Sequence, residues 1–238
     1  MNEPQTPYTI SPLGDAALLI SLGNCIDEDI NKKVLRLFHR LHSTQIVGVV
    51  DITPAYSSLA VYYDVMAVRQ TGETAFEVMK EKIFGLLTDE SNGEDVAARI
   101  IEIPVCYDKD LAPDIEILAT KKNLTVEEVI HLHTATTYRV YTLGFLPGFA
   151  YMGKVAEKIA TPRKASPVNV AAGSVGIAGE QTGIYPYPSP GGWNIIGRTP
   201  VPLFDKEKMP PALLQPGDEV TFYPITKDEF ENYKGRLA

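Results

Sequence analysis

The sequence has little cysteine, a deficit of positive charge and no long apolar run, and each shortage excludes a class of protein. Cys25 and Cys106 are its two cysteines. They lie far apart without a CxxC pair, which predicts two structural thiols in a reducing compartment. Lysine and arginine number 22 against 30 aspartate and glutamate residues, a net charge of −8, so no nucleic-acid or acidic-membrane partner is expected. With no apolar run long enough to span a membrane and no leader-like start, we expect a cytoplasmic location.

Motifs for metals and nucleotides are also missing. His39 and His42 lie three residues apart near the end of a predicted helix, where positive charge favours exposed carbonyl groups. His131 and His133 would point to different faces of a helix, so the four histidines predict no metal site. No GxxxxGK[ST] phosphate loop occurs anywhere in the chain.

Residues 1–95 predict a small α+β domain. Apolar residues recur at helical spacing over residues 27–42 and again over residues 76–86, and acidic residues open the first of these helices. The predicted order is strand, strand, helix, strand, strand, helix, strand, which indicates helices on one face of a mostly antiparallel sheet. The predicted strands lie within residues 8–22 and at residues 46–53 and 58–63, and the order ends with a strand at residues 99–105, which lies beyond the predicted boundary at residue 95.

Residues 96–238 predict a second domain of a different kind. Pro113 and a capping box at residues 125–128 signal two short helices, and a second capping box at residues 226–229 begins a short C-terminal helix. After His133, short β-like runs alternate with glycine and proline turns, which indicates a barrel or a sandwich. The predicted strands are residues 138–143, 175–178, 193–196, 201–203 and 219–223.

One stretch, residues 143–200, has an unusual composition. It holds ten of the 18 glycines and seven of the 18 prolines, yet Glu180 is the single charged residue between Ala165 and Gly197. A linker rich in glycine and proline would be polar, whereas this stretch is threaded with apolar and aromatic residues. It therefore predicts a packed β structure with sharp turns, whose main chain a ligand or partner can approach closely.

Two residues are candidates for catalysis. Ser174 lies in a sequence one methyl group away from GxSxG, but no helix follows it, so a ligand contact is preferred to a nucleophile elbow. His133 precedes the strand that leads into the glycine-rich stretch and is a candidate general acid or base, although a place at a helix end is the more common explanation. Four cations, Arg139, Arg163, Lys164 and Arg198, flank the uncharged region and are candidate contacts for a carboxylate or phosphate.

Several ordered motifs resemble those of a known family. They are LGFLPGFAY at residues 143–151, TPRK at 161–164, AGSVGIAG at 172–179, QTGIYP at 181–186, SPGGW at 189–193 and IGRTP at 196–200. Together they resemble the family of 5-oxoprolinase B subunits, which was formerly labelled allophanate hydrolase subunit 1 and includes KipI-like inhibitors of a sporulation kinase. The resemblance covers most of the chain from about residue 100.

The resemblance implies a fold and an activity. The implied fold is an N-terminal ferredoxin-like α+β domain followed by a C-terminal cyclophilin-like β-barrel. The implied activity is ATP-dependent opening of the lactam of 5-oxoproline to L-glutamate, with ATP as co-substrate and with the A subunit and a KipA-like C subunit as partners. Arg139, Arg163 and Arg198 would then bind anions, while Gln181, Thr182 and Ser174 would donate hydrogen bonds.

A second function is also open at this point. The family resemblance equally allows a regulatory module that inhibits a sensor histidine kinase without catalysis of its own. The aromatic residues Phe145, Phe149, Tyr151 and Trp193 would then be the anchors of a partner interface. Because both functions occur in one family, the motifs alone do not separate them. The general need of cells for lactam scavenging favours the enzyme subunit.

Overall fold

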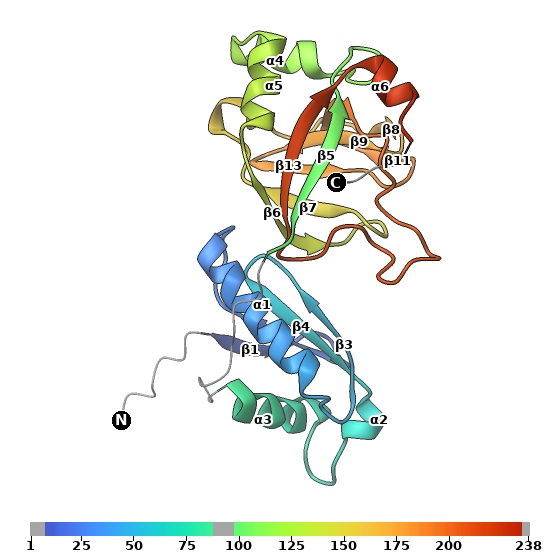
Figure 1. The fold of residues 1–238 in the computed structure, drawn as a ribbon. Helices are drawn as coiled ribbons and strands as arrows, with labels where there is room; N and C mark the ends of the chain where they lie inside the picture. The colour runs from blue at the N-terminus through green and yellow to red at the C-terminus, as the bar shows by residue number, and fades with distance from the viewer. Residues whose placement is uncertain (1–7, 88–97, 235–238) are drawn as a thin grey trace. The chain divides into compact units, whose positions relative to one another are not determined.

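The computed structural model describes residues 8–87 and 98–234. These residues form two compact units, one on each side of the intervening segment, and each unit is described by itself. The predicted domain boundary between residues 95 and 96 lies outside the described residues. Figure 1 shows a helix-covered sheet in the first unit and a barrel in the second.

The first unit is a four-stranded antiparallel sheet with helices, as predicted. Its strand order is β1-β2-β4-β3, so the first two strands form a hairpin. The helices contribute to one apolar core with the sheet, in which Leu18, Leu59 and Met79 are fully buried. The elements are β1 (Thr9–Pro12), β2 (Ala17–Ser21), α1 (Glu28–Ser43), β3 (Val49–Pro54), β4 (Ser58–Tyr63), α2 (Val65–Val68) and α3 (Ala75–Leu87).

Helix α1 begins and ends as its charges predict. The Asp27 carboxylate caps the helix by accepting a hydrogen bond from the backbone N–H of Ile30 at 2.9 Å. Acidic residues occupy the first turn, and Arg40 and His42 the last, so both ends complement the helix dipole. Val34, Leu35 and Leu41 are buried on the face toward the sheet. The amphipathic pattern thus determines both the length of α1 and the face that packs.

One predicted strand belongs to the other unit. The predicted strand order alone suggests that residues 99–105 complete the first sheet, although the predicted boundary at residue 95 leaves them in the second domain. In the structure, β5 (Ile100–Cys106) pairs in parallel with β13 (Glu219–Ile225), more than a hundred residues later. The apolar pattern of β5 predicts a strand and cannot say which sheet receives it. The correction leaves the first sheet with four strands.

The second unit is a closed barrel of seven strands, which confirms the predicted α+β class with a C-terminal β-barrel. The strand order is β10-β7-β6-β13-β5-β12-β9, and a two-stranded sheet, β11-β8, accompanies it. The remaining strands are β6 (Tyr138–Leu143), β7 (Ala150–Gly153), β8 (Val168–Val170), β9 (Ser174–Ala178), β10 (Gln181–Ile184), β11 (Ser189–Gly191) and β12 (Asn194–Arg198). Residues 201–203, predicted as a strand, are irregular.

Short helices accompany the barrel. They are α4 (Ile115–Lys122), α5 (Val126–Thr134), the 3₁₀ turn η1 (Glu157–Ile159) and α6 (Lys227–Glu231). Both predicted capping boxes are present, at Thr125 with Glu128 and at Thr226 with Glu229. Asn123 ends α4 in the left-handed conformation, which an asparagine tolerates better than most residues. None of the described helices is long and apolar enough to cross a membrane.

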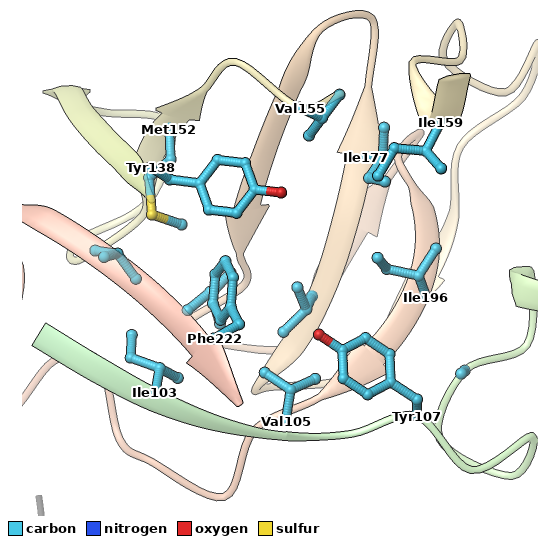
Figure 2. Packing of buried hydrophobic residues seen from close by; sticks show 14 of the residues in the cluster. Ile103, Val105, Tyr107, Tyr138, Met152, Val155, Ile159, Ile177, Ile196 and Phe222 are labelled. Atoms are coloured by element: carbon cyan, nitrogen blue, oxygen red, sulfur yellow. The ribbon is translucent and has the colours of Figure 1, made fainter. Parts of the chain in front are cut away.

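The interior of the barrel is filled by side chains. Figure 2 shows Ile103 and Val105 of β5 near Phe222 of β13, with Tyr107 and Tyr138 extending their rings among the aliphatic residues. Full burial of an aliphatic or aromatic side chain stabilises a fold by about 1.5–3 kcal/mol. The barrel is therefore a packed core, and a ligand site must lie on its outside.

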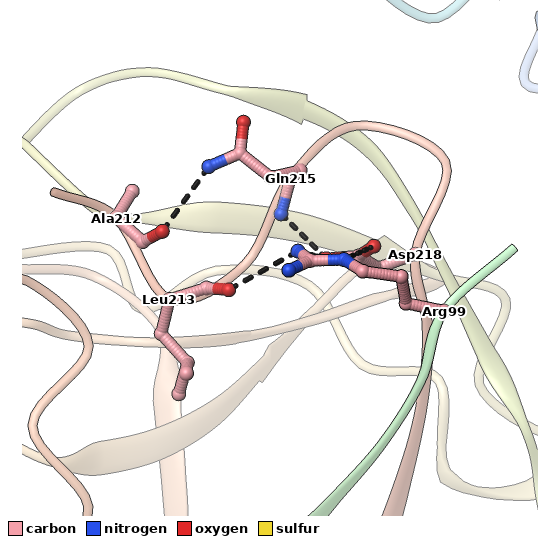
Figure 3. A network of polar contacts seen from close by, with 5 residues as sticks. All are labelled: Arg99, Ala212, Leu213, Gln215 and Asp218. Carbon is pink, nitrogen blue, oxygen red and sulfur yellow. Dashed lines mark hydrogen bonds and ion pairs between the residues drawn. The ribbon is translucent and has the colours of Figure 1, made fainter. Parts of the chain in front are cut away.

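A long irregular segment, residues 199–218, connects β12 to β13. Arg99 holds its end: Nε donates to Asp218 Oδ1 at 2.8 Å, and Nη2 donates to Leu213 O at 3.2 Å (Figure 3). The Asp218 carboxylate also accepts the backbone N–H of Gln215 at 2.6 Å. Asp218 thereby joins the start of β5 to the turn before β13.

Candidate functional site

A small pocket lies on the outside of the barrel beside β9 and β12. Its volume is about 180 Å³. Six apolar residues form about half of its lining. The polar side chains in the lining are those of Asp110, Lys164, Asn169, Ser174 and Arg198, and the apolar residues are Leu111, Pro113, Val168, Val170, Ala171 and Ile195.

Strand register brings two of the predicted residues together here. Arg198 of β12 pairs with Ser174 of β9 on one side and with Cys106 of β5 on the other. Residues paired across neighbouring strands point to the same face of a sheet. The neighbouring Val175 packs in the barrel core, so Ser174 and Arg198 belong to the outer face. Two residues that are well separated in the chain thus share one site.

Ser174 contributes a hydroxyl group to the pocket. The residue is 4% exposed, and its backbone N–H and C=O are bonded to Ala171 and Tyr185. Its side-chain oxygen has no hydrogen-bond partner among residues 8–87 and 98–234. Among the described residues, the fully buried side-chain oxygen without a partner is that of Ser189, so the Ser174 oxygen keeps accessible surface and is available to a ligand.

Arg198 contributes the positive charge. Its Nε donates to the backbone carbonyl of Ala172 at 2.7 Å, and its guanidinium carbon lies 5.8 Å from the centre of the Phe230 ring. Within the described part of the chain, no carboxylate lies within ion-pair distance of Arg198. The backbone bond and the ring of α6 hold the guanidinium, while its two terminal nitrogens remain for a ligand.

The other cations near the pocket are each paired. Lys164 Nζ lies 2.6 Å from Asp114 Oδ2, which also accepts the backbone N–H of Ile195. Lys227 Nζ lies 2.6 Å from Asp110 Oδ2 at the rim, and this hydrogen bond lowers the pKa of the exposed Asp110 carboxyl group. Two carboxylates thus offset two ammonium groups. Among the described residues of the pocket, Arg198 is left as the uncompensated charge.

Gly173 shapes the loop that carries Ser174. Its φ is +81°, and a Cβ atom at this position would lie 2.3 Å from the backbone oxygen of Thr199. Thr199 N donates to Gly173 O at 2.9 Å across this close approach, and Gly173 N donates to Tyr185 O at 2.7 Å. The first glycine of the AGSVGIAG motif is required by the contact with Thr199, and no phosphate is needed to explain it.

His133 and Thr182 lie inside the barrel, away from the pocket. His133 is fully buried, with Nδ1 2.8 Å from the Tyr107 hydroxyl oxygen and Nε2 3.0 Å from Thr182 Oγ1. Its ring stacks on Phe222, and burial lowers its pKa to about 3. His133 is therefore a neutral imidazole whose two ring nitrogens are hydrogen-bonded in the core. These contacts account for a histidine at this position. Thr182, also fully buried, donates to Gly176 O at 3.1 Å.

The remaining predicted ligand contacts lie elsewhere on the barrel. Arg139 of β6 and Gln181 of β10 both pair with Gly153 of β7 and so flank it on one face. Neither lines the pocket of Ser174 and Arg198. Arg163 is exposed, with its guanidinium carbon 5.9 Å from the centre of the Trp193 ring. The flanking arginines therefore do not converge, and each one's predicted anion contact stays a prediction.

The aromatic residues predicted as interface anchors form a cluster of their own. Phe149 and Trp193 are 1% and 4% exposed, and their rings meet edge to face at 5.5 Å. This burial corrects their prediction as anchors, because neither offers a surface to a partner. Phe145 is 59% exposed and Tyr151 is partly exposed, so the interface prediction continues to apply to these two.

Three residues in or beside the pocket escape prediction from the sequence: Asp114, Asn169 and Phe230. Asp114 comes just before α4 and meets Lys164 from fifty residues further along the chain. Phe230 reaches Arg198 from the last described helix. The one sequence signal near them is the TPRK motif, which points to Lys164. The residues next to Asp114 and Phe230 in the sequence give no sign of these contacts, because the contacts depend on how distant strands pair.

Comparison with known proteins assigns the chain to a family. The family model described as carboxyltransferase domain, subdomain C and D, matches residues 8–214. A curated relative from Bacillus subtilis (strain 168), named as the B subunit of 5-oxoprolinase, is 42% identical over 95% of this chain and 97% of its own length. The chain belongs to the family of 5-oxoprolinase B subunits. A further member from Escherichia coli O157:H7 is 37% identical over 89% of this chain and 94% of its own length.

Solved structures extend this family likeness. The crystal structure of TTHA0988 has a TM-score of 0.76 at 35% identity, over 88% of this chain and 40% of that longer chain. The conserved uncharacterized protein PH0987 from Pyrococcus horikoshii is 45% identical over 93% of this chain and 100% of its own, with a TM-score of 0.54. Relatives of this 5-oxoprolinase family member thus include chains of its own size and longer chains that contain a unit like it.

Proposed function

We propose that this chain is the B subunit of an ATP-dependent 5-oxoprolinase, which opens the lactam of 5-oxoproline to L-glutamate. The observation that carries the proposal is the 42% identity to a protein of that name over nearly the full length of both chains. Identity of this extent includes both units, the α+β sheet and the barrel. It therefore supports a shared role of the whole chain.

The chemistry explains why ATP and several subunits are needed. An amide carbon is a poor electrophile, and a phosphoryl group transferred from ATP to the amide oxygen would make it more reactive toward water. A site for this reaction needs contacts for the substrate carboxylate and hydrogen-bond donors for the developing oxyanion. The pocket of Arg198 and Ser174 supplies a cation and a hydroxyl group of the kind required.

A general base is expected from a partner protein. Within the described residues, the predicted candidate His133 is fully buried and bonded at both ring nitrogens. A group that takes a proton from water must reach that water within hydrogen-bond distance. The B subunit would accordingly bind and orient substrate, while the base and the site for ATP lie on the A subunit or on the KipA-like C subunit.

The lengths of the relatives support such partners. TTHA0988 is matched over 40% of its chain, whereas the B. subtilis protein is matched over 97% of its own. The same kind of unit therefore occurs both with and without further polypeptide attached. In TTHA0988 the additional polypeptide is part of the same chain as this unit. In a relative that lacks it, a separate protein with the same role would bind to the unit.

Reconstitution tests the proposal. The chain is purified, mixed with the A and C subunits encoded by its source organism, and assayed for 5-oxoproline-dependent ATP hydrolysis and for glutamate. We expect activity in the complete mixture and none when any one of the three proteins is omitted. As a control, the B. subtilis B subunit replaces this chain. If that replacement restores activity and this chain does not, the proposed function is wrong.

A further inference from the structure

We infer that the pocket beside β9 and β12 binds the carboxylate group of a small molecule, with Arg198 as the anion contact and Ser174 as a hydrogen-bond donor. The inference rests on the proposed function only for the identity of the natural ligand, 5-oxoproline. The recognition of a carboxylate follows from the pocket itself and is tested separately.

Among the described residues of the pocket, Arg198 carries the positive charge that is not offset. Lys164 and Lys227 each have a carboxylate oxygen at 2.6 Å, so their charges are offset locally. Arg198 has a backbone carbonyl at 2.7 Å and, among the residues that the structure describes, no carboxylate. In a chain of net charge −8, a half-buried arginine without an acidic partner is unusual. An anionic ligand supplies the missing partner, and the planar guanidinium suits the two oxygens of a carboxylate.

The Ser174 hydroxyl group is open to a ligand. It lines the pocket, it has no hydrogen-bond partner among the described residues, and it is not one of their fully buried side-chain oxygens that lack a partner, so its oxygen keeps accessible surface. Because Ser174 pairs with Arg198 in strand register, one carboxylate is able to meet both.

The pocket is small. A pocket of about 180 Å³ is smaller than the 300–1,000 Å³ of sites that hold drug-sized ligands. Leu111, Val168 and Ile195 give it apolar walls. These dimensions favour a small ring or short chain carrying one carboxylate over a nucleotide. Inorganic phosphate shares the anionic chemistry and serves as a competing probe.

The guanidinium group of Arg198 is preorganised. The bond from Arg198 Nε to Ala172 O and the contact with Phe230 fix the guanidinium before a ligand arrives. Helix α6, which carries Phe230, is fastened to the pocket rim by Lys227 and Asp110. A contact that is already ordered loses less side-chain entropy on binding.

The test measures ligand binding to the full chain by calorimetry and by NMR. The probes are 5-oxoproline, cyclopentanecarboxylate, the uncharged lactam 2-pyrrolidinone, inorganic phosphate and ATP. We expect the two carboxylates to bind saturably and to compete with each other. Arg198→Met is expected to weaken carboxylate binding about 10- to 100-fold, and Ser174→Ala about 3- to 10-fold, with Arg198→Lys between wild type and Arg198→Met.

Arg69→Met is the matched control, because Arg69 is an exposed arginine that does not line the pocket and has no predicted part in binding. It is expected to change carboxylate affinity by less than about twofold, as is usual for surface sites. Arg198→Lys keeps the positive charge and serves as a second variant in case Arg198→Met fails to fold. The NMR spectrum of each variant shows directly whether it is folded.

Three outcomes overturn the inference. They are no saturable carboxylate binding to the folded chain, equal carboxylate affinity in the wild type and Arg198→Met, and saturable binding of phosphate or ATP without binding of either carboxylate. If cyclopentanecarboxylate binds through Arg198 while the complete mixture of the three proteins lacks 5-oxoprolinase activity, the proposed function fails and the carboxylate pocket stands. The two failures are thereby separated.

Discussion

The imidazole of His133 and the hydroxyl group of Tyr107 are hydrogen-bonded at 2.8 Å inside the closed barrel, and this contact fixes the direction of a chain of hydrogen bonds. Thr182 donates its hydroxyl proton to Gly176 O at 3.1 Å, so its oxygen accepts from His133 Nε2 at 3.0 Å. Nε2 therefore carries the proton, and Nδ1 accepts from Tyr107. The chain ties helix α5 to strands β9 and β10.

The buried imidazole makes stability depend on pH. Burial lowers the pKa of His133 from 6.5 to about 3, so the folded state binds fewer protons than the unfolded state between these values. Stability then rises with pH in this window and is lost as pH falls from about 6.5 toward 3, at up to about 1.4 kcal/mol per pH unit. Chemical denaturation at pH 7, 6, 5 and 4 measures this slope.

The control for the pH prediction is His133→Gln, which retains hydrogen-bonding capacity without a titrating ring. The wild type should lose unfolding free energy faster than this variant as pH falls below about 6.5. Equal slopes in the two proteins would show that His133 does not titrate in this way. The wild-type ¹⁵N spectrum should in addition report a neutral ring protonated at Nε2 at pH 7.

Thr182 supplies a second test of the same chain. Thr182→Val preserves shape and removes the hydroxyl group, which leaves His133 Nε2 and Gly176 O without their partner. We expect a loss of about 2–4 kcal/mol in unfolding free energy, since each buried group left unpaired costs about 1–3 kcal/mol. Thr182→Ser retains the hydroxyl group and should lose about 1 kcal/mol for the missing methyl group. Denaturant midpoints that agree for the two variants would contradict the assignment.

Local signals predict most of the fold. Asp27 and the capping boxes at Thr125 and Thr226 mark helix starts correctly. A capping residue bonds a backbone group only three residues further along the chain, so the signal is local. The runs at residues 58–63 and 138–143 match β4 and β6 because alternation in a half-buried strand is also local. The sequence order places β5 in the wrong sheet because its partner, β13, lies more than a hundred residues away.

The candidate site is predicted less completely for the same reason. Arg198 and Ser174 stand out as polar groups in or beside an uncharged, glycine-rich stretch, and strand register unites them. Asp114 and Phe230 carry no local mark, because their contacts with Lys164 and Arg198 depend on the closed barrel. The buried aromatics Phe149 and Trp193 resemble anchors in the sequence because composition does not reveal which aromatic rings pack on one another.

The ion pair of Arg99 with Asp218 predicts an asymmetry between its two halves (Figure 3). The Asp218 side chain is 5% exposed, whereas that of Arg99 is 49% exposed. Arg99→Met leaves a buried carboxylate with Gln215 N as its main donor and should cost about 2–3 kcal/mol. Asp218→Asn leaves a guanidinium that water can solvate and should cost about 1–2 kcal/mol.

Urea denaturation at pH 7 compares these two variants, and Lys208→Met serves as the surface control. Lys208 contacts Asp205 only at 3.9 Å, and its side chain is 69% exposed, so its replacement should change stability by less than about 0.5 kcal/mol. A larger loss of unfolding free energy in Asp218→Asn than in Arg99→Met would contradict the prediction. It would mean that the hydrogen bond from Gln215 N to Asp218, and not the exposure of the two side chains, decides which replacement costs more.

Gly173 and Gly179 form a matched pair for testing the loop beneath the candidate pocket. Both have positive φ, +81° and +61°, but a Cβ on Gly173 would lie 2.3 Å from Thr199 O, whereas a Cβ on Gly179 meets nothing within 4 Å. Gly179→Ala should therefore cost about 1–2 kcal/mol for the left-handed conformation alone.

Gly173→Ala adds a clash with backbone that cannot move without breaking the bond from Thr199 N to Gly173 O. We expect it to cost at least about 2 kcal/mol more than Gly179→Ala, because backbone overlap adds to the same dihedral strain, and to shift the NMR signals of Ser174 and Arg198. Equal costs in thermal unfolding would show that the backbone at Thr199, just after β12, moves easily, and that the loop does not hold the pocket in place.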